Sequence, residues 1–62
     1  MSAYEIVEQV RGDRKKAEVR RYAGTFSSKY AVYDADTDER VAGTFDNRPA
    51  AYEAARKYVG LD

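Results

Sequence analysis

The residues best suited to chemistry in this chain are the arginines, lysines and tyrosines of its middle third. Arg20 and Tyr22 are two residues apart, and Lys29 and Tyr33 are four apart, so each pair shares a face if it lies on a strand. Aromatic rings stack on bases while Arg and Lys meet phosphates, and the same residue types are enriched at protein–protein hot spots. Cross-strand pairing on an ordinary exposed sheet face explains the pattern as well. A binding surface is therefore one interpretation, with protein and nucleic acid near parity as partners.

Residues for catalysis are scarce. The chain has 62 residues without His or Cys, and its Ser residues have no visible general base. We therefore predict no enzyme and no cofactor. Asp34, Asp36 and Asp38 resemble the opening of a calcium loop, but Glu39 stands where Gly is required and Phe45 where the bidentate Glu is required. We predict no metal, and attribute these aspartates to side-chain bonds with the backbone of a turn.

Composition limits the class of protein. The 11 basic and 11 acidic residues give a formal net charge of zero, which argues against a strongly electrostatic partner such as bulk duplex DNA. The charges are unevenly distributed, because residues 1–30 carry seven Lys/Arg against four Asp/Glu and residues 31–62 carry the reverse. With no Cys, no signal-like start and no long apolar run, we expect a cytoplasmic location and no membrane partner.

The chain is predicted to form one small β-β-β-β-α domain over residues 1–62. Apolar residues alternate along four segments separated by turn residues, which is typical of strands. The four predicted strands are Ala3 to Val10, Lys16 to Tyr22, Lys29 to Tyr33 and Arg40 to Phe45. The fold class is α+β: an antiparallel sheet of three to four strands with one C-terminal helix packed on one face.

The helix after Phe45 is the clearest element. Its apolar stripe repeats at helical spacing and is mostly Ala, so the helix should lie close to the sheet. Asp46 or Asn47 can cap its start, Pro49 fits the first turn and Gly60 ends it. The predicted core consists of Ile6, Val19, Val32, Val41, Phe45, Ala51, Ala55 and Tyr58.

Part of the chain resembles known DNA-binding families. The segment from Lys29 to Asp34, a polar turn, Arg40 to Asp46 and then Ala50 to Ala55 resembles the plant AP2-type domains and the arm-binding domains of phage integrases, and Val19 to Arg21 is similar to their first strand. The resemblance implies a three-stranded sheet, backed by a helix, that lies in the major groove. It implies DNA-contacting roles at the matching positions, which are Arg20, Arg21, Lys29, Tyr33 and Arg40. The Asp-rich turn and the absence of Trp depart from the AP2 pattern.

Three functional hypotheses remain open. The favoured one is a non-enzymatic binding module, of regulator or inhibitor type, that presents Arg20, Tyr22, Lys29, Tyr33 and Arg40 to a protein or nucleic acid. The alternatives are a DNA-binding domain of the integrase or AP2 type and a self-associating structural domain that forms a homodimer.

A separate basic run lies between Arg11 and Arg21, with six basic and two acidic residues. It fits a hairpin tip that contacts phosphates. We favour a solvent-exposed turn, followed by an edge strand on which lysine prevents pairing with another chain.

Overall fold

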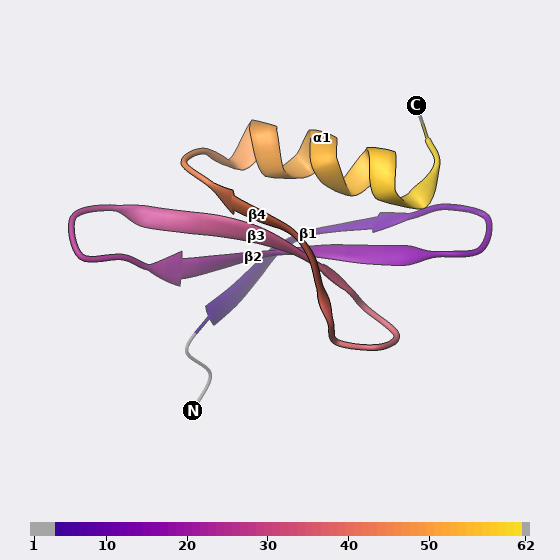
Figure 1. Cartoon of the computed structure of the whole chain (residues 1–62), viewed down its shortest axis with the longest axis horizontal. Helices are drawn as coiled ribbons and strands as arrows, with labels where there is room; N and C mark the ends of the chain where they lie inside the picture. The colour runs from indigo at the N-terminus through magenta and orange to yellow at the C-terminus, as the bar shows by residue number, and fades with distance from the viewer. Residues whose placement is uncertain (1–3, 62) are drawn as a thin grey trace.

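A computed structural model of the chain describes residues 4–61. It contains β1 (Tyr4–Arg11), β2 (Lys16–Ala23), β3 (Ser28–Asp34), β4 (Arg40–Phe45) and α1 (Arg48–Val59). The strands form one sheet in the order β1-β2-β3-β4, and every neighbouring pair is antiparallel. Helix α1 lies across one face of this sheet, as Figure 1 shows. This confirms the predicted α+β class. The start of the first predicted strand, Ala3, lies outside the described residues.

Helix α1 is capped at both ends by residues whose types favour helix termini, Asn47 and Gly60. Asn47, with extended backbone angles, accepts a hydrogen bond from the backbone N–H of Ala50 at 2.9 Å, so it is the cap rather than Asp46. Gly60 has φ of 83°, in the left-handed region that favours glycine, and its N–H bonds to carbonyls of the last turn. Among the described residues there is no helix long and apolar enough to cross a membrane.

The core lies between α1 and the inner sheet strands. Val19 and Val32 face each other across β2 and β3, and they are the largest fully buried side chains. Ala51 and Ala55 are fully buried against them, as expected of a helix whose small side chains permit close approach. Of the other predicted core residues, Val41, Phe45 and Tyr58 pack against this cluster while staying partly exposed.

One predicted core residue, Ile6, is wrong. Its side chain is 44% exposed, whereas Val10, four residues later, is only 5% exposed and belongs to the core. Strict alternation would put both side chains on one face. A β-bulge between Ile6 and Glu8 shifts the register, so that Ile6 pairs with Arg20 while Glu8 pairs with Val19. An extra residue in one strand reverses the facing of all that follow, and this places Ile6 on the face opposite the helix.

Candidate functional site

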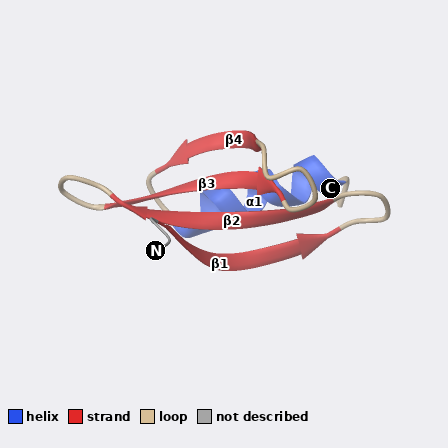
Figure 2. Ribbon diagram, turned by 90° about the horizontal axis from the view of Figure 1, so that it is seen from below, coloured by secondary structure: helices blue, strands red, loops and turns tan. Residues whose placement is uncertain are grey.

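The sheet face turned away from α1, here called the open face, is not covered by any described element. Figure 2 shows the sheet in front of the helix when the molecule is seen from this side. The cross-strand register fixes which residues share it: Tyr4 pairs with Tyr22, Ile6 with Arg20, Tyr22 with Lys29, Arg20 with Ala31, and Tyr33 with both Glu18 and Arg40. All five sequence-predicted site residues therefore belong to this face.

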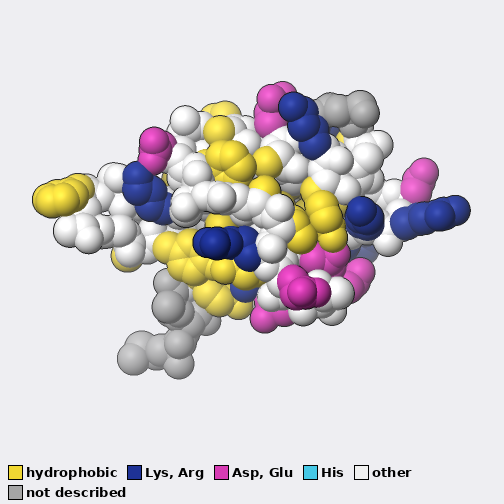
Figure 3. Space-filling view, viewed as in Figure 1, with side chains coloured by type: hydrophobic (Ala, Val, Ile, Leu, Met, Phe, Trp, Pro, Cys, Tyr) yellow, Lys and Arg dark blue, Asp and Glu magenta, His cyan; other side chains and the backbone are white. Residues whose placement is uncertain are grey.

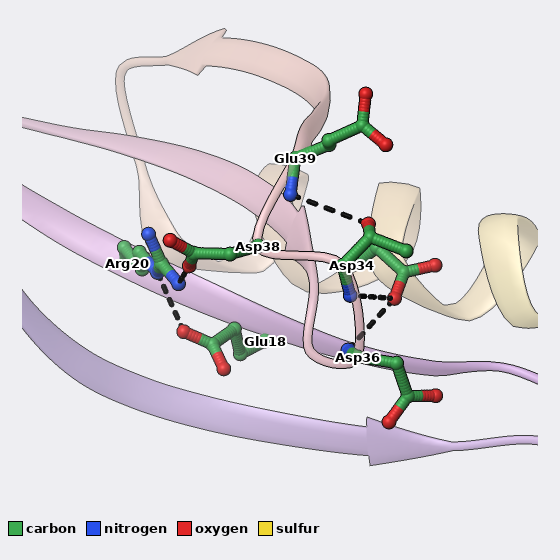
Figure 4. A network of polar contacts seen from close by, with 7 residues as sticks. Glu18, Arg20, Asp34, Asp36, Asp38 and Glu39 are labelled. Carbon is green, nitrogen blue, oxygen red and sulfur yellow. Dashed lines mark hydrogen bonds and ion pairs between the residues drawn. The ribbon is translucent and has the colours of Figure 1, made fainter.

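Arg20 stands at the centre of the open face, and only 6% of the residue is exposed. Its Nε donates to Glu18 Oε2 at 2.5 Å, and its Nη2 donates to Asp38 Oδ1 (Figure 4). The guanidinium carbon also lies 4.3 Å from the ring centroid of Tyr4 and 3.9 Å from that of Tyr33. Two aromatic rings and two carboxylates of the protein itself thus already contact this cation.

These contacts fix the charge of Arg20. Burial alone lowers the pKa of a guanidinium, but the hydrogen bonds to Asp38 and Glu18 outweigh it and leave the Arg20 pKa above its ordinary value. The group stays cationic, and two carboxylates oppose its charge. Its function within the chain is therefore to hold the tyrosines and the β3–β4 loop in place.

The tyrosines form a continuous row across three strands. The ring centroids of Tyr4 and Tyr22 are 5.9 Å apart, and those of Tyr22 and Tyr33 are 6.3 Å apart, with tilted planes in both pairs. Loss of hydration, followed by a hydrogen bond with Tyr33, raises the pKa of Tyr22 to about 12. Tyr22 is therefore uncharged at neutral pH, and the row offers ring faces and edges together with the exposed Ile6.

The other two predicted cations, Lys29 and Arg40, differ in whether a carboxylate pairs with them. Lys29 lies opposite Tyr22 in the register, but its Nζ is paired with Asp46 at the start of the helix connection. Arg40 is exposed on edge strand β4, and within residues 4–61 no carboxylate pairs with it.

Sequence reasoning missed three members of the cluster. Glu18 is two residues from Arg20 on the same strand, so period-two parity could have identified that pair. Tyr4 shares parity with Ile6 but was not assigned to this face. Asp38 reaches Arg20 from 18 residues away, with φ of 63°, and no local signal indicates the contact.

The Asp-rich connection between β3 and β4 is built around one carboxylate. Asp34 Oδ1 accepts from the backbone N–H groups of Asp36 at 2.8 Å and Thr37 at 3.1 Å, and Tyr58 donates its hydroxyl to Asp34 Oδ2 at 2.5 Å. Figure 4 shows the loop folded around the contacts of Asp34 with the loop backbone. The interpretation of the three aspartates as residues that bond the turn backbone is confirmed for Asp34, whereas the Asp38 carboxylate pairs with Arg20.

This arrangement predicts an acid-sensitive loop. The Tyr58 hydroxyl, followed by the two backbone N–H groups, holds the pKa of Asp34 below its ordinary value. A carboxyl group with a lower pKa in the folded state stabilises the fold at neutral pH, and this contribution is lost as the pH falls from about 4 through the folded pKa. We expect urea unfolding to show a smaller loss of stability on acidification for Asp34→Asn than for the wild type. Asp36→Asn, at an exposed position, is the control. Equal acid sensitivity of the wild type and Asp34→Asn would contradict the assignment.

With this geometry the chain is a ββββα domain with an aromatic open face and a helix-covered face. Comparisons of the chain with protein-family models, with curated proteins and with solved structures find no match.

Proposed function

We propose that this chain is a small non-enzymatic binding module of the cytoplasm, of regulator or inhibitor type, whose open face binds a protein. The observation that carries the proposal is the composition of the open face. Its buried Arg20 is paired with carboxylates, its tyrosines form a row, and Ile6 is exposed. Tyr and Arg supply much of the binding energy at protein interfaces, while charged groups are depleted at interface centres. A face with rigid rings and internally paired charges suits such a centre.

The integrase-type or AP2-type alternative would use the same face for DNA. Phosphate contacts require cations that can exchange their counterions for the DNA backbone. Here Arg20 is paired with two carboxylates and Lys29 with one, so binding phosphate would first require breaking these pairs. These pairs favour a protein partner over DNA at the open face.

Capture from a nuclease-treated extract of the source cells tests the proposal. The immobilised wild type is compared with Ile6→Ser and Tyr22→Ser, which remove apolar and aromatic surface from the open face. Leu61→Ser is the matched control, because Leu61 is also 44% exposed but follows the helix. We expect a protein that is retained by the wild type and the control and lost by both open-face variants, with retention that changes little with salt.

Two results would redirect the proposal. A protein retained from an untreated extract but not from the nuclease-treated one would assign the face to nucleic acid and support the DNA-binding alternative. A mass from light scattering that rises with concentration for the wild type, but not for Ile6→Ser, would make a second copy of this chain the partner. Circular dichroism spectra of the variants confirm that each is folded before capture is interpreted.

A further inference from the structure

The tip of the β1–β2 hairpin, residues 11–16, is called here the basic hairpin. It carries Arg11, Arg14, Lys15 and Lys16 against the single acidic residue Asp13. The tip lies at one end of the long axis of the molecule in Figure 1, and Lys and Arg side chains stand out from the same end in Figure 3. This surface is separate from the open face, and the proposed function does not use it.

The cations of the basic hairpin differ from those of the sheet in their pairing. Arg20, Arg21, Lys29 and Arg48 are each in an ion pair with a carboxylate. Within residues 4–61, none of the four basic-hairpin cations is in an ion pair. Four positive charges within six residues are therefore not neutralised by ion pairs with any carboxylate of residues 4–61, although the chain as a whole has no net charge.

The strand register adds to this local repulsion. Arg11 and Lys16 are direct cross-strand partners, and like charges placed opposite each other destabilise a sheet. An anion bound between them would convert this repulsion into two attractive contacts. The Arg11–Lys16 pair thus destabilises the protein without a ligand and favours the binding of an anion.

The basic hairpin is also held in one geometry by its neighbours. The Gly12 N–H donates to the Lys15 carbonyl at 2.9 Å, and the Gly12 backbone is packed so closely on Val59 that it leaves no room for a side chain. Lys15 Nζ lies 4.5 Å from the ring centroid of Tyr58. The turn is therefore fixed to the C-terminal end of α1, so little ordering is needed when a ligand binds.

Two shallow recesses flank this turn. One, of about 230 Å³, is lined by all four cations together with Asp13 and Asp36. The other, of about 340 Å³, lies between Arg14, Lys15 and the end of α1 at Tyr58 to Gly60. The first recess has four positive and two negative side chains, so it retains an excess of positive charge.

We propose that the basic hairpin binds the phosphate backbone of a nucleic acid. A two-stranded ribbon fits the major groove, and Arg and Lys are the side chains that contact phosphates there. No apolar side chain lies within residues 11–16 to enter a bilayer, which favours a nucleic acid over a lipid surface. Because the contacts are to phosphate, binding is independent of base sequence, with a Kd of about 10⁻⁴ to 10⁻⁶ M at physiological salt.

Fluorescence anisotropy with a short labelled DNA duplex of mixed sequence, titrated at several salt concentrations, tests this proposal. Arg11→Gln/Arg14→Gln removes two exposed cations from the basic hairpin. Arg48→Gln/Lys57→Gln is the control, because it makes the same change of net charge at exposed positions of α1, outside both the basic hairpin and the open face. We expect at least a tenfold loss of affinity for the hairpin variant. The slope of log K against log salt concentration should also become shallower by about the amount that two phosphate contacts contribute. The affinity of the control variant for the duplex should fall by no more than about twofold, as expected for a change in long-range charge alone.

Several outcomes would overturn the proposal. An equal loss in both double variants would show a net-charge effect with no localised site. Absence of binding at low salt would remove the site, and stronger binding to phosphatidylglycerol vesicles than to the duplex would assign it to lipid. Relief of the Arg11–Lys16 repulsion should leave the hairpin variant at least as stable as the wild type, so unfolding cannot explain its loss of affinity. Unchanged DNA binding by Ile6→Ser separates this test from that of the open face.

Discussion

Arg20→Met is expected to remove at least about a third of the stability of this protein. The substitution leaves the Glu18 carboxylate, in a residue only 7% exposed, without its ion-pair partner. Breaking a buried ion pair from one side costs about 3–5 kcal/mol. A chain of 62 residues has a total stability of roughly 3–9 kcal/mol at 0.05–0.15 kcal/mol per residue. The loss is thus at least about a third of the total, and urea unfolding followed by circular dichroism should show a clearly lower midpoint.

The double variant Glu18→Leu/Arg20→Met provides the decisive comparison. Replacing both members of a buried pair by apolar side chains is commonly neutral, and Met also packs well against aromatic rings. The remaining partner, Asp38, is exposed and can be hydrated. We therefore expect the double variant to recover most of the stability lost in Arg20→Met.

Arg21→Met is the control for the substitution itself. Arg21 pairs with Glu5, and both side chains are about half exposed, so the loss should not exceed about 1 kcal/mol. If Arg20→Met were no more destabilising than Arg21→Met, water would reach Glu18 freely, and Arg20 would not organise the open face.

Gly12→Ala is the second substitution with a large expected effect. A Cβ atom at position 12 would lie 2.2 Å from the carbonyl oxygen of Val59 and 2.9 Å from its Cβ. Neither atom belongs to a flexible side-chain end, so the hairpin or the last turn of α1 must move. Overpacking of this kind costs about 1–3 kcal/mol. We expect a lower midpoint of urea unfolding and faster amide hydrogen exchange in both the hairpin and the last helical turn.

Gly24→Ala is the matched control. Its Cβ would meet the carbonyl oxygen of Ser27 at 2.1 Å, but both residues belong to the exposed connection between β2 and β3. A surface loop can adjust at small cost, so we expect little change in stability and none in exchange at α1. Equal effects of the two substitutions would show that α1 is not anchored through Gly12.

Much of the fold follows from local sequence. Helix α1 was predictable because its cap, its alanine stripe and Gly60 act within a few residues of one another. Alternation correctly placed Val19 and Val32 on the covered face and Arg20, Tyr22 and Tyr33 on the opposite one, because side-chain facing along a regular strand depends only on parity. Three of the five predicted site residues therefore meet in one cluster.

The pairing of charges could not be predicted in the same way. The sequence alone left Arg20 and Lys29 as candidate phosphate contacts, and the basic run from Arg11 as a solvated turn. In the structure, Asp38 and Asp46 neutralise the first two from 18 and 17 residues away, while the cations of the basic hairpin are in no ion pair within residues 4–61. The geometry of the loops decides which cation each carboxylate contacts. That geometry cannot be deduced from residue type and spacing alone.

Interactions between residues close in the chain explain why the α+β class, the helix with its caps, and the regular alternation of β2 and β3 could be predicted from the sequence. The outward facing of Ile6 and the contact of Gly12 with Val59 could be seen only in the folded structure. The same holds for the enclosure of Arg20 by its own chain. These features depend on a single β-bulge and on contacts between distant segments, and such contacts form only when the whole chain is packed.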